Sequence, residues 1–518
     1  MNSGDIDSKP GGIGLRTSLL IASAVALVVS AGAALAQDVQ DKSPAKTSPN
    51  AETTALYAAE ADYQQGHCDR VLERVEPLLK PETAAKVESV LFAHAYTIAA
   101  SCKLQALDKG GAYRYARAGT ALPDATEWLW RVRLGLELDD KRWADGIATV
   151  EAMHRDAPLA LNSVETRWLH SFSRELKDSQ PALRRRLLAV LADPAYVPDG
   201  PLETTDYFRK EYAGLLFDAG DRKGAAALVH GIALTPVLLD LAYDPRFRGA
   251  IPPDYDFRAA TERHLAEARE AIADYPDLLA PMVEAAGALR QLGRPQESID
   301  LLETVHARVL GQGKPFADAG EKLNWWWDAL ARAHEMLGQP DQAIAAFRFG
   351  VAAREGGATN VSQTINLAHA QNRFGRPREA LATLAKVDAS FVASPYGNAE
   401  MHLALGCAHA QLGEQAAAAE DLAYLNAHAK DHPDALTHLQ LCMNDLDGAA
   451  AGFIAKLADP DQRSRALIDL SDYDAPPVPL PHDLMRARLP ELKARPDVRA
   501  AIARAGGVRR IHLQATEL

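Results

Sequence analysis

Residues that could do chemistry are sparse in this 518-residue sequence. His428 and His432 are four positions apart, a spacing at which one helix can offer two imidazoles to a metal ion. However, His432 precedes Pro433 and is therefore expected in a turn. His334 and Glu335 lack the second histidine of a zinc-binding helix. The sequence contains no Cys-x-x-Cys, no Gly-x-Ser-x-Gly and no phosphate-binding loop ending in Lys-Ser/Thr. We therefore expect no enzyme activity, no metal and no cofactor.

The composition indicates which elements must position any functional residues. Hydrophobic residues make up 47% of the chain, aromatic residues only 6%, and alanine is abundant throughout. Alanine favours closely packed helices because it loses no side-chain entropy when a helix forms. Alternating runs of Val, Ile and Thr, which strands need, are scarce. We predict an all-α protein, built at this length as several domains or one elongated array.

The net charge disfavours one class of partner. The chain carries 69 acidic and 56 basic residues, a formal charge of −13 at pH 7. A protein of this charge repels nucleic acid and anionic lipid. The basic runs near Arg131 and at residues 184–186 are expected on solvated helix faces. We expect no nucleic-acid partner.

The N-terminus has the pattern of a secretion signal. Arg16 precedes an apolar run at residues 19–35, and Ala34 and Ala36 are small residues two apart before a polar one. Signal peptidase cleaves after such a pair. The alternative is an uncleaved single-span anchor, because about 17–19 apolar residues can cross a bilayer.

Cleavage after Ala36 defines the expected mature protein. Residues 1–36 would be removed as a signal peptide, and residues 37–54 would form a disordered tether. We expect the mature chain in the periplasm of a Gram-negative bacterium, with no direct membrane insertion.

A repeated segment dominates the second half of the chain. Four segments align on a glycine, with a small residue five positions later and a large apolar residue four positions after that. The glycines are Gly293, Gly338, Gly375 and Gly413, the small residues are Ser298, Ala343, Ala380 and Ala418, and the large residues are Leu302, Phe347, Leu384 and Leu422.

This pattern resembles the tetratricopeptide repeat, a helix-turn-helix unit of about 34 residues. With Gly338 at the fifteenth position of the repeat, Asn324 is the first and Trp327 the fourth, a core position. Trp326 is expected to pack between units. The other repeats replace the large residue at the fourth position by Met282, Thr364 and His402, so the family assignment depends on the periodicity.

The resemblance implies a right-handed α-solenoid of about ten units. Weaker copies extend the pattern, and we divide it into a divergent N-terminal array at residues 55–251 and a C-terminal array at residues 257–460. Residues 461–518 are expected to form a Pro-rich strap and a C-terminal capping helix. Residues 245–251 and 496–502 look alike, and each is expected to be a short helix that closes one array. The alternative is that these proline breaks recur by chance.

The resemblance also implies a binding surface, because the first helix of each unit lines the concave face in this family. Trp325 looks into the groove in this register, although packing on the preceding helix is the alternative. The residues at groove-lining positions are Trp325, Asp328, Arg332, Glu335, Met336, Ile365, His369, Asn372, Arg373, Glu400, Leu403 and Gln411.

The four cysteines separate into two pairs in this register. Cys68 begins a second helix and Cys102 lies late in the adjacent first helix, so we expect a disulfide contributing about 3 kcal/mol. Cys407 and Cys442 both occupy the ninth position of neighbouring units, about one helix diameter or 10 Å apart. That separation exceeds the disulfide reach of about 7 Å, and we expect free or weakly paired thiols.

The sequence thus favours an exported scaffold that binds a protein or extended peptide in its concave groove. The resemblance implies roles in envelope assembly, secretion or polysaccharide export. One alternative is an α-solenoid enzyme acting on an envelope carbohydrate or lipid, which would need paired carboxylates in a deep pocket. Another is a membrane-tethered assembly factor that keeps its N-terminal helix. The sequence sets no oligomeric state.

Overall fold

The computed structural model describes residues 50–515 except 248, 354–359 and 388–393. These residues divide into two compact units, one ending at Leu215 and the other beginning at Leu216. The predicted signal peptide and most of the predicted tether lie outside the described residues. The prediction is wrong for the last residues of the tether, because residues 51–54 form the first turn of a helix. Asn50 accepts a hydrogen bond from the backbone of Thr53 there, at 2.7 Å, as an N-cap residue does.

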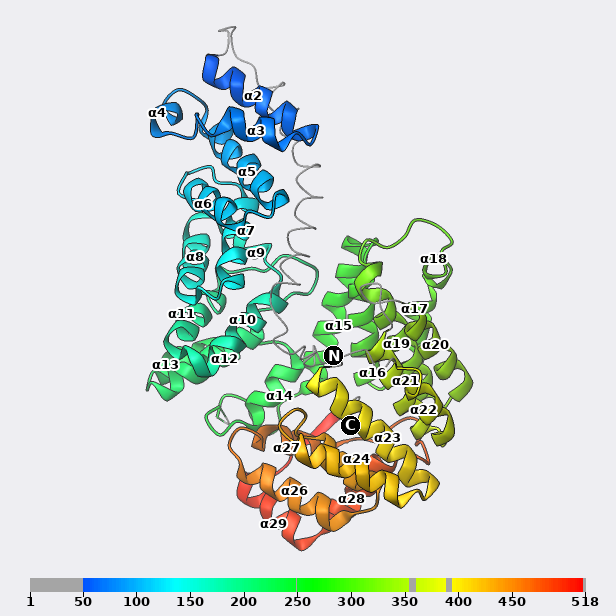
Figure 1. Ribbon diagram of the computed structural model, residues 1–518. Helices are drawn as coiled ribbons and strands as arrows, with labels where there is room; N and C mark the ends of the chain where they lie inside the picture. The colour runs from blue at the N-terminus through cyan, green and yellow to red at the C-terminus, as the bar shows by residue number, and fades with distance from the viewer. Residues whose placement is uncertain (1–49, 248, 354–359, 388–393, 516–518) are drawn as a thin grey trace. The chain divides into compact units, whose positions relative to one another are not determined.

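The N-terminal unit is a succession of helix pairs (Figure 1). Its helices are α2 (Ala51–Gln64), α3 (Cys68–Val75), α4 (Pro81–Ala84), α5 (Ser89–Gln105), α6 (Lys109–Gly119), α7 (Glu127–Asp139), α8 (Trp143–Asp156), α9 (Pro158–Asn162), α10 (Thr166–Ser179), α11 (Pro181–Leu191) and the greater part of α12 (Asp206–Asp218). The paired helices α2 and α3, α5 and α6, α7 and α8, and α10 and α11 pack against each other, and α3, α6 and α8 each also pack against a helix of the following pair.

The C-terminal unit continues the same construction. Its helices up to the last repeat are α13 (Arg222–His230), α14 (Thr235–Tyr243), α15 (Phe257–Asp274), α16 (Ala280–Gln291), α17 (Pro295–Glu303), α18 (His306–Val309), α19 (Ala319–Met336), α20 (Pro340–Ala352), α21 (Val361–Arg373), α22 (Pro377–Leu384), α23 (Pro395–Leu412), α24 (Gln415–Ala427), α25 (Ala435–Cys442) and α26 (Leu446–Ala458). The prediction of an all-α repeat array is confirmed.

The turns form because a glycine takes the left-handed conformation and small residues let the paired helices approach. Gly338 has a φ of 64°, which costs glycine nothing. The following Gln339 closes the turn by donating its backbone N–H to His334 O at 3.0 Å, the bond of a Schellman motif. Ala331 on α19 and Ala343 on α20 are both fully buried.

The chain ends in elements that were only partly predicted. After α27 (Arg463–Asp469) comes strand β1 (Asp472–Asp474), which pairs in parallel with β2 (Arg510–Gln514). Residues 475–483, which we call the strap, follow β1 and lead into α28 (Leu484–Ala494) and α29 (Pro496–Ala505). β2 packs against α15 and α16, so the last part of the chain returns to the first repeats of its unit.

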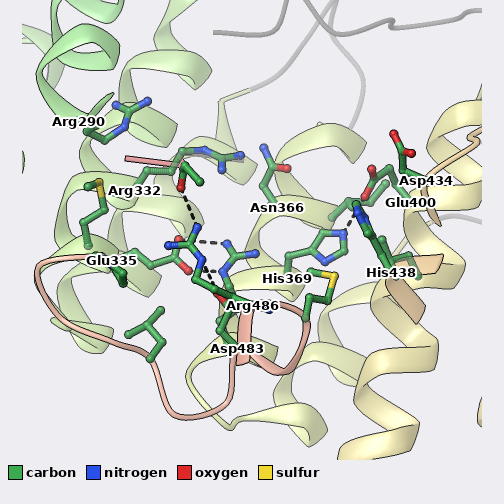
Figure 2. A pocket seen from close by; sticks show the side chains of 18 of the residues that line it. Arg290, Arg332, Glu335, Asn366, His369, Glu400, Asp434, His438, Asp483 and Arg486 are labelled. Carbon is green, nitrogen blue, oxygen red and sulfur yellow. Dashed lines mark hydrogen bonds and ion pairs between the residues drawn. The ribbon is translucent and has the colours of Figure 1, made fainter. Parts of the chain in front are cut away.

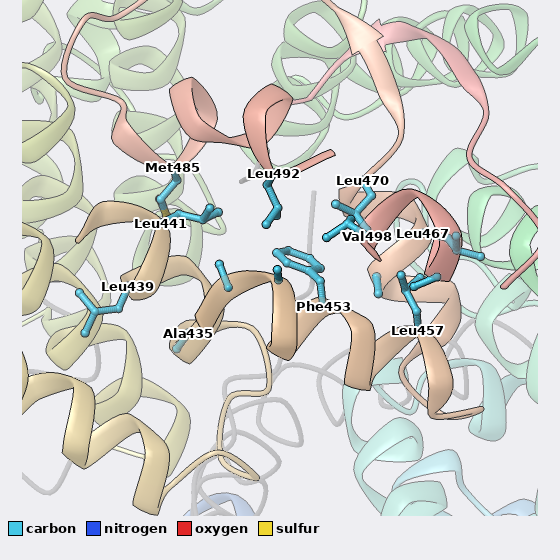
Figure 3. Packing of buried hydrophobic residues seen from close by; sticks show 14 of the residues in the cluster. Ala435, Leu439, Leu441, Phe453, Leu457, Leu467, Leu470, Met485, Leu492 and Val498 are labelled. Carbon is cyan, nitrogen blue, oxygen red and sulfur yellow. The ribbon is translucent and has the colours of Figure 1, made fainter. Parts of the chain in front are cut away.

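A shared apolar core holds the C-terminal elements on the last repeat. Phe453 of α26 is 1% exposed and faces Leu492 of α28 and Val498 of α29 (Figure 3). Helix α29 contains the helix predicted at residues 496–502. Among the described residues, no helix is both long and apolar enough to cross a membrane.

The segment at residues 245–251 differs from its prediction. Its described residues form turns and not a helix, and they belong to the C-terminal unit. Arg509, just before β2, donates to the backbone oxygens of Ala242, Ile251 and Pro252 at 2.9, 3.2 and 2.6 Å. The predicted capping helix is therefore not formed by the described residues of this segment, and Arg509 anchors the segment within the C-terminal unit.

Both cysteine pairs form disulfides. Cys68 is bonded to Cys102, as predicted. The prediction of free or weakly paired thiols at Cys407 and Cys442 is wrong, because these residues are also bonded, with their Cα atoms 5.2 Å apart. Cys407 of α23 and Cys442 of α25 face each other, so their Cα atoms lie much closer together than the axes of the two helices do. Gly406 permits this approach, since a Cβ there would lie 2.6 Å from Leu439 Cδ1.

Candidate functional site

The concave side of the C-terminal unit holds a pocket of about 540 Å³. Its lining comes from the first helices α16, α19, α21, α23 and α25, from Arg465 of α27, and from the strap, the start of α28 and the end of β2. The principal lining residues are Arg290, Trp325, Arg332, Glu335, Met336, Ser362, Ile365, Asn366, His369, Arg373, Tyr396, Glu400, Leu403, His432, Asp434, His438, Arg465, Pro476, Val478, Pro479, Leu480, Asp483, Met485, Arg486 and Gln514.

Most of the predicted groove residues lie together in this pocket. Nine line it, namely Trp325, Arg332, Glu335, Met336, Ile365, His369, Arg373, Glu400 and Leu403. The other three connect helices beneath its surface. Asp328 accepts from Arg332 Nε and Asn366 Nδ2 at 2.7 and 2.9 Å. Asn372 donates to Ala404 O at 2.8 Å, and Gln411 donates to Asn372 O at 3.1 Å.

The three consecutive tryptophans have different surroundings. Trp326 and Trp327 are 0% and 4% exposed and contact each other edge to face, with ring centroids 4.8 Å apart. Trp325 is half-buried and lines the pocket. It packs against the edge of the same apolar cluster. Helical geometry explains the difference, because successive residues point about 100° apart around the axis.

Arginines gather at one end of the pocket (Figure 2). Arg373 of α21 forms a bidentate ion pair with Glu335 of α19, in which its Nη2 lies 3.0 Å from Oε2. Arg486 of α28 donates to Ala515 O at 2.7 Å, and its Nε lies 3.6 Å from Asp483 Oδ2. Burial alone would raise the pKa of Glu335, but Arg373, with Arg332 and Arg486 nearby, holds it below its usual value. The carboxylate therefore stays ionised and fixes the guanidinium groups in place.

Glu400 and histidines occupy the other end (Figure 2). His369 Nε2 lies 2.9 Å from Glu400 Oε2, and His432 Nε2 lies 2.7 Å from Oε1. Tyr396 donates to Oε1 at 3.1 Å and stacks on His432 with ring centroids 4.5 Å apart. Burial would raise the pKa of Glu400, but the hydrogen bonds from the two histidines hold it well below its usual value.

A buried ion pair adjoins the Glu400 end of the pocket. Lys456 donates to Asp434 Oδ1 at 2.7 Å. Burial would raise the pKa of Asp434, but the charges of Lys456 and His438 lower it to about 2. Burial lowers the pKa of His438 to about 4, so this imidazole is neutral at pH 7. His438 lines the pocket, and its buried Nε2 has no hydrogen-bond partner among the described residues.

Several pocket residues were missed by sequence reasoning. His432 was considered only as a partner of His428 for a metal, whereas it binds Glu400, 32 residues earlier. Its position in the turn before α25 directs it into the pocket. Asp483 and Arg486 lie at the start of α28, beyond the repeats, and no repeat pattern could register them. Across the described residues, no group of three or more His, Cys, Asp or Glu side chains could hold a metal ion.

Comparisons with known proteins add little. No protein-family model matches the chain, and no curated protein matches it. Among solved structures, the structure of Naa15/Naa10 bound to HypK-THB matches at 12% identity over 88% of this chain and 80% of that chain, with a TM-score of 0.19. That likeness is too weak to support an argument about this chain.

Proposed function

We propose that this chain is a tetratricopeptide-like scaffold that grips a short segment of a protein or peptide partner in the pocket. The observation that carries the proposal is the enclosure itself. First helices of successive repeats and the strap together surround about 540 Å³, within the range of about 300–1,000 Å³ typical of specific ligand sites. This volume accommodates a few residues of a partner.

The lining has the composition of a binding pocket. Trp325, Ile365 and Leu403 add apolar surface to a lining that also holds arginines and Glu400. Such a surface suits a segment whose apolar side chain is flanked by polar groups. Ion pairs and hydrogen bonds already fix most of the charged side chains, so little side-chain entropy is lost when the segment binds.

The state of the carboxylates supports binding over catalysis. A general acid needs a pKa raised toward the working pH, but the pKa values of Glu335 and Glu400 are both lowered. Asp469 has a pKa raised by burial to about 6, yet it does not line the pocket. We therefore propose a role without catalysis, in place of the alternative of a carbohydrate- or lipid-directed enzyme.

Export is the second part of the proposal. Both disulfides favour an oxidising compartment, and all four cysteines take part in them. This agrees with a periplasmic protein released by cleavage after Ala36, with a role in envelope assembly, secretion or polysaccharide export. N-terminal sequencing of the protein purified from cells tests the cleavage. An intact apolar N-terminus would favour the membrane-tethered alternative.

The binding proposal is tested with a photo-crosslinking amino acid placed at Trp325 in living cells. A second probe at Met336 lies in the same pocket, and a control probe at Arg348 lies exposed on α20. We expect one discrete adduct shared by the two pocket probes and absent at Arg348. Equal labelling at all three positions, or none at the pocket positions in folded protein, would contradict the proposal.

A variant that fills the pocket tests whether the crosslinked partner binds inside it. Ser362→Trp places a large ring inside the lining, whereas Arg348→Trp places the same ring on the exposed face of α20. The captured partner, identified by mass spectrometry and then purified, should bind the Arg348→Trp variant normally. It should lose most of its affinity for Ser362→Trp.

A further inference from the structure

The strap touches the repeats at their turn glycines. A Cβ added at Gly338 would lie 2.7 Å from Val478 Cγ1, and one at Gly375 would lie 2.5 Å from His482 Cδ2. Distances below 3.0 Å are essentially never seen for real Cβ atoms. Each of these strap side chains therefore occupies the space that a turn side chain would need. Gly413, the corresponding turn glycine of the next repeat, has no such neighbour within 4 Å.

The middle of the strap is held to the repeats by side chains only. Four of its nine residues are prolines, which have no N–H to donate. At its first residue, Gln514 of β2 donates to Ala475 O at 3.0 Å. The backbone bonds further along the strap are local, from Asp483 N to Leu480 O and from Leu484 N to His482 O. Its two ends are fixed by β1 and by α28. Residues 476–481 can therefore leave the repeat surface without breaking a backbone hydrogen bond to it.

We propose that the strap is a size gate for the binding site. Seated on Gly338 and Gly375, it restricts the site to a short segment, and its release lets a longer segment lie along the concave face. The reason is its position, because Val478, Pro479 and Leu480 line the pocket together with residues of α19 and α21. This inference rests on the proposed function for its biological use, while the gate itself can be measured without a partner.

A single introduced thiol reports on the gate. All four natural cysteines are in disulfides, so Met336→Cys places the only free thiol of the protein in the pocket lining. The measurement is the ratio of its labelling rates with a bulky maleimide–polyethylene glycol and with small N-ethylmaleimide. The small reagent corrects for any change in the reactivity of the thiol itself.

Two independent routes release the strap in this Met336→Cys background. Gly338→Ala inserts a methyl group against Val478, and Val478→Ala with His482→Ala removes the two seated side chains. Gly413→Ala is the matched control, because its φ of 75° imposes a similar backbone cost while its methyl group meets no neighbour. The Val478→Ala, His482→Ala variant keeps the test decisive if Gly338→Ala fails to fold.

We expect the ratio to rise about tenfold in both released variants, which corresponds to about 1.4 kcal/mol of lost strap contact. We expect Gly413→Ala to match the parent. An unchanged ratio in the Val478→Ala, His482→Ala variant, or an equal rise in Gly413→Ala, would contradict the proposal that the strap is a gate. Failure of the proposed function looks different, since the ratio would rise while the Trp325 probe captured no partner.

Discussion

The turns of the two units share one backbone conformation but not one residue type. In the N-terminal unit, Leu107 and Lys141 take φ values of 58° and 56°, and in the C-terminal unit Gly338 and Gly375 take 64° and 69°. A left-handed conformation costs a non-glycine residue roughly 1–2 kcal/mol. Leu107 and Lys141 therefore bear a backbone cost that Gly338 and Gly375 avoid, although Asn444 of the C-terminal unit also takes a positive φ, of 60°.

The environment of each turn explains the difference. Leu107 is 88% exposed, so its side chain meets no neighbour, whereas Gly338 and Gly375 lie beneath the strap. Glycine at a covered turn supplies space as well as backbone freedom. At an open turn only the backbone matters, and other residues are tolerated. Gly66 and Gly413 are glycines at open turns, so glycine alone does not identify a covered one.

The disulfides give the largest expected effect and test whether the units are independent. Each unit holds one bridge, and the bridges close loops of 34 and 35 residues. The chain-entropy model gives about 3–4 kcal/mol of stabilisation for a loop of this length. We expect replacement of both cysteines of a pair by alanine to lower the unfolding free energy of its own unit by that amount. Hydrogen exchange during urea unfolding, followed separately in each unit, measures it.

A different result would show that the two units are not independent. If removing Cys68 and Cys102 lowered protection in the C-terminal unit as much as in the N-terminal one, the two units would unfold together. The difference between the turns of the two units could then not be related to the stability of either unit by itself.

The pocket gives the C-terminal unit a pH dependence, through His438. Burial holds its folded-state pKa at about 4, below the ordinary value near 6.5. Between these pH values the unfolded chain binds a proton that the folded chain does not, so stability falls as pH drops from about 6.5 to about 4. The full effect is about 3 kcal/mol. We expect His438→Gln to remove this part of the acid sensitivity, measured by urea unfolding across that range.

Asp469 provides the control for that measurement. Burial raises its pKa to about 6, so the folded chain holds a proton that the unfolded chain has lost, and its contribution has the opposite sign. Asp469→Asn should therefore make stability fall more steeply on acidification, while His438→Gln makes it fall less steeply. Parallel changes in both variants would contradict the assignment.

The sequence predicted the parts of this site that depend on local periodicity. Spacing of turn glycines located the helix pairs, and the register placed Trp325 apart from Trp326 and Trp327. Local periodicity carries no information about contacts between distant segments. Val478 meets Gly338 across 140 residues, and nothing in either segment identifies the other.

The cysteine prediction failed for a different physical reason. It assumed that equivalent positions on neighbouring first helices are one helix diameter apart, whereas Cys407 and Cys442 face each other with Cα atoms 5.2 Å apart, and Gly406 leaves room there for Leu439. Small residues at the contact were visible in the sequence, but the helix that they face was not.

The covered turns predict a specific penalty at Gly375. Gly375→Ala and Gly66→Ala should both carry the left-handed backbone cost of roughly 1–2 kcal/mol, because both glycines have a positive φ. Only Gly375→Ala brings a methyl group against the His482 ring, and overpacking adds about 1–3 kcal/mol. Adding His482→Ala should recover the excess in Gly375→Ala and should change Gly66→Ala by its own cost only. Additive costs in a double-mutant cycle would contradict contact between strap and turn.

The smallest expected effect concerns Leu107, where the open turn should gain from glycine. Leu107→Gly removes a left-handed cost of roughly 1–2 kcal/mol but adds chain entropy to the unfolded state, about 0.4–1 kcal/mol. The expected net gain is about 0.5 kcal/mol, measured by urea unfolding of the N-terminal unit. Leu107→Asn should gain a similar amount, because asparagine tolerates this conformation without the entropic cost of glycine. A loss in both variants would mean that the exposed leucine side chain contributes to stability, and open turns would then be defined by more than their backbone.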